Sequence, residues 1–103
     1  MINLEEKYLN QVKEILFKNL KNTNIKVYAF GSRTKQNYRQ YSDLDLALKL
    51  EDKKIEYKLI SNLKYDFEES LIPITVDVLD LNDISESFKK CIEKDLTELD
   101  YKL

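Results

Sequence analysis

The chain has 103 residues, of which 35% are charged, and a formal net charge of −2. This length fits one domain covering residues 1–103, because domains commonly contain about 100–150 residues. A near-neutral charge argues against direct nucleic-acid binding, which normally requires a basic excess. No apolar run approaches the roughly 20 residues that span a bilayer, and the acidic first residues do not resemble a signal peptide. We therefore expect a cytoplasmic protein without membrane association.

Cysteine and histidine usage narrows the chemistry. The single cysteine, Cys91, excludes an internal disulfide, and we expect it in the core because it falls on the apolar side of a predicted helix. The chain has no histidine, which excludes histidine acid–base catalysis, histidine-activated nucleophiles and the usual zinc enzymes. Any metal must be held by oxygen ligands, and this favours Mg²⁺ or Mn²⁺.

The first half of the chain alternates helix and strand signals. Apolar residues at helical spacing predict a helix over about residues 4–21, with Asn3 as its N-cap. Residues 25–30 are rich in β-branched and aromatic side chains and predict a strand. Alternating apolar and polar residues predict a second strand over residues 43–50.

The second half continues the alternation. A second helix follows Asp52 and stops before Pro73, because a proline disfavours helix in the preceding residue. Residues 74–79 predict a third strand, and Asp83 begins a last helix. Residues 96–99 either continue that helix or form a short strand. This order predicts an α/β (α+β) fold in which the helices pack on one face of the sheet and leave the other face open.

The segment between the first two strands carries the chemistry. It contains the only glycine, in the pair Gly31-Ser32, followed after ten residues by Asp43-Leu44-Asp45. Alternate strand residues share a face, so the two aspartates lie together. A divalent cation such as Mg²⁺ would relieve their repulsion. A glycine permits close approach of a ligand, and a short helix after Ser32 would favour a phosphate. The segment indicates a site for a metal-bound nucleoside triphosphate.

Asp77 lies in the middle of the apolar third strand. One interpretation is an exposed edge position. The other places it beside Asp43 and Asp45 as a third metal ligand or as a general base. Asp80, on the opposite face of the same strand, is the competing candidate.

Gly-Ser, ten residues and Asp-x-Asp resemble the signature of the DNA polymerase β nucleotidyltransferase superfamily. The short chain is most similar to its minimal nucleotidyltransferase (MNT) antitoxin branch. Basic residues commonly follow the serine there, and Arg33 and Lys35 match them, whereas Gln36 departs from the usual glycine. The resemblance implies a palm-like core with a short mixed sheet. It also implies a third acidic residue after the second helix, a position that Asp77 matches.

The resemblance further implies a metal-dependent nucleotidyltransferase that uses ATP and two Mg²⁺ or Mn²⁺ ions. Three carboxylates would be catalytic and would hold the metal: Asp43, Asp45 and Asp77. Three residues of the loop would bind the nucleotide phosphates: Gly31, Ser32 and Arg33.

MNT proteins that resemble this chain often act as antitoxins by adenylylating a tyrosine of a partner HEPN-domain ribonuclease toxin. We therefore predict transfer of AMP from ATP to a hydroxyl of such a toxin, within a hetero-oligomer. Two alternatives remain. One is a non-catalytic antitoxin that neutralises its partner by binding, and the other is a nucleotidyltransferase acting on RNA or on a small molecule.

Overall fold

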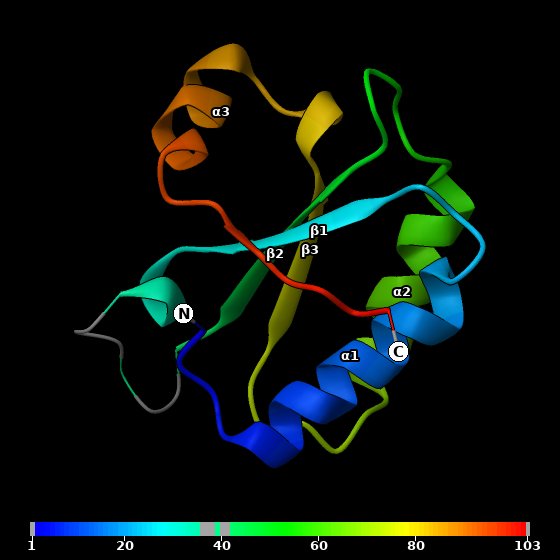
Figure 1. The fold of residues 1–103 in the computed structure, drawn as a ribbon, viewed down its shortest axis with the longest axis vertical. Coiled ribbons are helices and arrows are strands. Elements are labelled where there is room, and N and C mark those ends of the chain that lie inside the picture. The colour runs from blue at the N-terminus through cyan, green and yellow to red at the C-terminus, as the bar shows by residue number, and fades with distance from the viewer. Residues whose placement is uncertain (1, 36–38, 40–41, 103) are drawn as a thin grey trace.

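A four-stranded mixed sheet forms the centre of the protein in a computed structural model that describes residues 2–35, 39 and 42–102 (Figure 1). The strand order is β3-β2-β1-β4. β1 pairs antiparallel with both β2 and β4, whereas β2 and β3 are parallel. The strands have the bounds β1 Lys26–Phe30, β2 Leu44–Lys49, β3 Val76–Asp80 and β4 Thr97–Glu98. The mixed sheet expected from the sequence is therefore confirmed, and residues 97–98 form a strand. Gln36 lies outside the described residues.

Two helices, α1 (Glu6–Leu20) and α2 (Tyr57–Glu68), cover one face of this sheet (Figure 1). They bury the leucine side chains of β2 and the valine side chains of β1 and β3 in one apolar core. The strand alternation read from the sequence explains this packing, because residues two apart point toward the same helices. The α1 helix begins at Glu6, later than predicted, and Asn3 is not its N-cap. None of the helices within the described ranges is long and apolar enough to cross a membrane.

The third helix, α3 (Glu86–Glu93), lies over the opposite face of the sheet. A second apolar cluster joins it to the strands through Phe30, Ala47, Leu81 and Ile92. Phe30 and Phe88 also meet edge to face, with ring centroids 6.4 Å apart. The expectation that all helices pack on one face is therefore wrong for α3. The helix α3 packs on the second face because that face is apolar at one end.

Cys91 is exposed on α3 and does not pack in the core as predicted. The short helix turns Ile92 toward the sheet, and Ile92 is 8% exposed. Helical periodicity placed both Cys91 and Ile92 near the apolar side of the helix. In the structure only Ile92 is buried against the sheet.

Candidate active site

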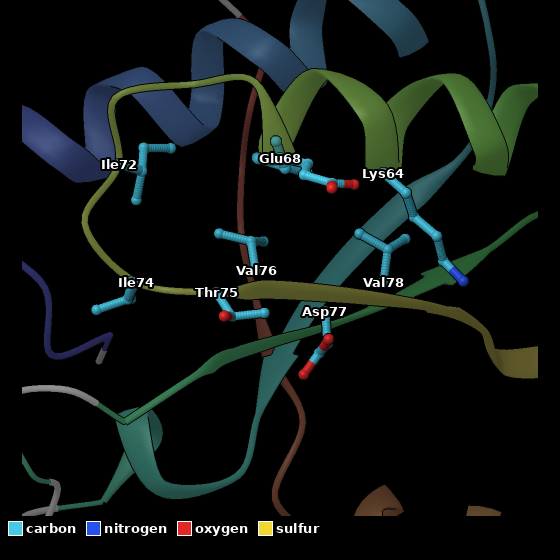
Figure 2. Close-up of a pocket in the computed structure, with 9 residues that line it drawn as sticks. Lys64, Glu68, Ile72, Ile74, Thr75, Val76, Asp77 and Val78 are labelled. Atoms are coloured by element: carbon cyan, nitrogen blue, oxygen red, sulfur yellow. The ribbon is translucent and has the colours of Figure 1, made fainter.

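The sheet register brings two of the predicted carboxylates side by side. Asp45 in β2 is the direct partner of Asp77 in β3, and Phe30 at the end of β1 is its partner on the other side. Neighbouring strands lie about 4.8 Å apart, so side chains at matched positions on one face interact. The side chain of Asp77 points away from α2, on the opposite side of its strand from Val76 and Val78 (Figure 2).

Asp43 directly precedes β2 and is exposed. Burial, followed by the nearby charges of Asp77 and Asp43, raises the pKa of Asp45 from 3.8 to about 6. Asp43 and Asp77 are therefore both close enough to Asp45 for their charges to repel its carboxylate. A concentration of negative charge of this kind favours the binding of a cation.

The carboxylates do not by themselves complete a metal site. Among the residues that the structure describes, no group of three or more His, Cys, Asp or Glu side chains forms a ready-made metal-binding cluster. An oxygen-only set of this kind still fits Mg²⁺, which usually takes one or two carboxylates and completes its shell with water and substrate phosphate oxygens.

Gly31 joins the end of β1 to this acidic row. Its φ of +82° lies in the left-handed region that side chains disfavour. A Cβ atom built on Gly31 would lie 2.6 Å from Oδ2 of Asp45. The glycine is therefore needed twice, once for its backbone conformation and once for the space that the Asp45 carboxylate occupies. The two halves of the sequence motif are in direct contact here.

Ser32 begins a single 3-10 turn, η1 (Ser32–Thr34), where the sequence predicted a short helix. The turn is held by the Thr34 backbone N–H and side-chain hydroxyl, which both donate to the Gly31 carbonyl at 3.1 Å and 2.7 Å. Ser32 itself is exposed. It directly follows Gly31, which lies against the Asp45 carboxylate.

Arg33 lies inside the fold, at 4% exposure, and not on the surface of the loop. Its Nε donates to the Ser42 carbonyl at 3.0 Å and its Nη1 donates to the Asn3 carbonyl at 2.7 Å. The Asn3 backbone N–H returns a bond to the Arg33 carbonyl at 2.7 Å, and its side-chain amide donates to Lys35 at 2.8 Å. Arg33 and Asn3 therefore brace the motif loop and the residue that precedes Asp43.

Sequence reasoning expected Arg33 to bind phosphate and made Asn3 a helix cap. The hydrogen bonds to backbone carbonyls give the Arg33 guanidinium a structural position, and phosphate binding by Arg33 stays a prediction. The supporting role of Asn3 left no local signal, because its partners lie about thirty residues away along the chain.

Asp80, the competing acidic residue of β3, has a structural place. Its Oδ1 accepts a bond from the Asn82 backbone N–H at 2.9 Å, and its Oδ2 accepts one from the Ile55 backbone N–H at 2.7 Å. Both oxygens are thereby engaged in fixing turns at the far end of the strand. Asp77 is the acidic residue of β3 that remains beside Asp45.

The sequence of this chain also matches a known protein family. Residues 10–99 match the family described as polymerase beta, nucleotidyltransferase. This chain belongs to that family. The membership expected from the Gly-Ser and Asp-x-Asp motif is confirmed.

One individual relative is also similar to this chain. Over 68 residues the chain is 43% identical to a Haemophilus influenzae protein named "Probable protein adenylyltransferase MntA". The match covers 66% of this chain and 59% of that relative, so the chain spans less than two thirds of the relative's length.

Solved structures share the fold at lower identity. A mutant MntA–HpeT toxin–antitoxin superposes with a TM-score of 0.65 at 19% identity, and a toxin–antitoxin crystallised with AMP-PNP superposes with a TM-score of 0.68 at 20% identity. Each match covers 87% of this chain and 70% of the other chain. The polymerase β-like core predicted from the sequence is therefore confirmed.

Proposed function

We propose that residues 1–103 form a minimal nucleotidyltransferase domain that transfers AMP from ATP to a hydroxyl group of a partner HEPN-domain toxin and so acts as an antitoxin. The observation that carries the proposal is the pairing of Asp45 with Asp77 beside the Gly31 turn. The relative named as a protein adenylyltransferase supports AMP transfer to protein. The toxin–antitoxin structures, one of them with AMP-PNP, support a toxin partner and an adenine nucleotide.

The donor set fits two Mg²⁺ or Mn²⁺ ions, because it offers only carboxylate oxygens and its charges already repel one another. Asp43, Asp45 and Asp77 would hold the ions together with phosphate oxygens of the nucleotide. When bound, the ions would neutralise charge on the triphosphate and lower the pKa of the attacking hydroxyl.

The residues of the chain then have distinct tasks. Asp77 is exposed and would accept the proton from the attacking hydroxyl, acting as a general base. The hydroxyl oxygen forms a bond to the α-phosphorus, the bond from that phosphorus to the bridging oxygen breaks, and pyrophosphate leaves. The exposed Ser32 hydroxyl would donate to a phosphate oxygen. Arg33 would support this phosphate site by holding the loop in place, because its guanidinium donates hydrogen bonds to the backbone carbonyls of Ser42 and Asn3.

We also propose that this reaction takes place in the cytoplasm, where ATP and Mg²⁺ are available to the enzyme.

The test is an incubation of the pure protein with α-labelled ATP, Mg²⁺ and the HEPN-domain protein encoded beside it. We expect label on a hydroxyl of the HEPN protein and loss of its ribonuclease activity. The Asp43→Asn and Asp45→Asn variants should keep the wild-type circular dichroism spectrum and lose the transfer. Neutralisation without label, or transfer of label to RNA alone, would overturn the proposal.

A further inference from the structure

The free edge of β3 is the strongest unassigned feature of the molecule. Within the described ranges, β3 is one of the two edge strands of the sheet, and β4 is the other. In a ladder, successive residues direct their backbone N–H and C=O groups to opposite sides of the strand. The Leu44 N–H donates to the Thr75 carbonyl at 2.9 Å, so Thr75 and Asp77 direct their backbone groups toward β2. Val76 and Val78 therefore direct theirs outward, away from the sheet.

A pocket of about 490 Å³ opens along this edge, between α2 and β3 (Figure 2). Its lining includes Lys64 and Glu68 from α2 and the stretch of chain from Ile74 to Val78. The side chains of Val76 and Val78 point toward α2, whereas Asp77 points to the other side of the strand (Figure 2). Asp77 thus belongs to the stretch of chain that lines the pocket, while its carboxylate points to the other side of the strand.

The edge is open over only part of its length. At the end of β3, Asp80 accepts a hydrogen bond from the Ile55 backbone at 2.7 Å, so the chain itself covers that end. Proteins commonly protect strand edges against pairing with other chains. Among the residues that the structure describes, no backbone hydrogen bond reaches the outward groups of Val76 and Val78, and this stretch lies beside Asp77.

We infer that the edge of β3 binds the acceptor protein as a short extended strand, an inference that rests on the proposed AMP transfer. The outward N–H and C=O groups of Val76 and Val78 match those of a peptide backbone, which is how strand edges bind peptides. Side chains of a paired strand alternate between two faces. The acceptor residue opposite Asp77 then presents its hydroxyl on the side of the carboxylates, and its two neighbours enter the pocket.

The chemistry of the edge favours a peptide over other occupants. Donors and acceptors alternate along the strand, a pattern that a nucleic-acid backbone, with acceptors only at its phosphates, does not match. Lys64 and Glu68 lie one helical turn apart on the pocket rim and present opposite charges. The residues on either side of the acceptor hydroxyl are therefore expected to be apolar, or to carry a charge complementary to the nearer of these two.

Two variants with one matched control test the inference. Val76→Pro removes the outward N–H, and proline is tolerated at a strand edge where that group faces solvent. Glu68→Trp fills the pocket, whereas Glu69→Trp adds the same side chain at a neighbouring exposed position that does not line the pocket. We expect KM for the HEPN protein to rise at least tenfold in Val76→Pro and Glu68→Trp and to stay unchanged in Glu69→Trp. The Kd for ATP with Mg²⁺ should stay unchanged in all three.

The outcomes separate this inference from the proposed function. If the wild-type protein labels its partner and Glu68→Trp does so with an unchanged KM, the edge inference is overturned and AMP transfer stands. If Val76→Pro fails to fold, Glu68→Trp still decides. If the wild-type protein labels nothing, the proposed function fails. The affinities of Glu68→Trp and Glu69→Trp for the HEPN protein then test the edge inference alone. Tenfold weaker binding of Glu68→Trp alone supports the edge, whereas equal binding or no binding overturns it.

Discussion

The sheet face that turns away from α1 and α2 has two halves with opposite chemistry. One half is apolar and packs beneath α3 through Phe30 and Ala47. The other half is acidic and carries Asp45 and Asp77, and burial, followed by the nearby charges of Asp77 and Asp43, raises the pKa of Asp45. The same strands supply both halves, because β2 contributes Ala47 to the first and Asp45 to the second. One half stabilises the fold, whereas the other carries an electrostatic cost that a bound cation or a proton on Asp45 would offset.

The two aspartates of β3 give the largest expected contrast. Asp77→Asn should lower the rate of AMP transfer by about 10²–10⁴-fold, because it removes the proposed general base. The melting temperature should not fall, since the substitution also removes repulsion with Asp45. Single-turnover transfer and thermal unfolding measure the two effects.

Asp80→Asn is the control in the same strand. It weakens two hydrogen bonds to backbone N–H groups and should lower the free energy of unfolding by about 1–3 kcal/mol. Its kcat should match that of the wild type. Loss of kcat in Asp80→Asn with full kcat in Asp77→Asn would reverse our assignment.

Gly31→Ala should damage both stability and activity. The added Cβ would meet Oδ2 of Asp45 at 2.6 Å on a backbone with φ of +82°, at a cost of about 1–3 kcal/mol. We also expect transfer to fall by more than tenfold, because Asp45 must move. Denaturant unfolding and transfer assays test this, and normal activity would mean that the position of Asp45 is not critical.

Ile92→Ala tests the apolar half alone. Removing a buried side chain that holds α3 on the sheet should lower the free energy of unfolding by about 2–4 kcal/mol. At a temperature where the variant stays folded, kcat should be unchanged, because α3 contributes no proposed catalytic group. A large loss of kcat in folded Ile92→Ala would show that the two halves are coupled.

The smallest effect concerns pH in the metal-free protein. Folding raises the pKa of Asp45 from 3.8 to about 6, so the folded state binds more protons between these values. The stability contribution is therefore present below about pH 4 and is lost as pH rises through 6. The melting temperature of Asp45→Asn minus that of the wild type should grow from pH 4 to pH 7. Saturating Mg²⁺ should reduce the difference at pH 7, and a difference that is flat with pH would contradict the raised pKa of Asp45.

Local patterns in the sequence were sufficient for the first three strands, for the order of the three helices and for the motif. Period-two alternation placed Asp77 on the opposite side of its strand from Val76 and Val78, as Figure 2 shows. The single glycine marked the tight turn, because no other residue type accepts its backbone so readily. These features depend on neighbours in the chain, and the sequence determined them by itself.

Tertiary structure alone decided which distant residues meet. The parallel register that pairs Asp45 with Asp77 forms across an intervening helix, and the bonds between Arg33 and Asn3 span thirty residues. The position of α3 over the second face, and the exposed edge of β3 beside the pocket, likewise follow from how the elements assemble. Such contacts depend on the geometry of the whole sheet, and no periodicity within a single segment encodes them.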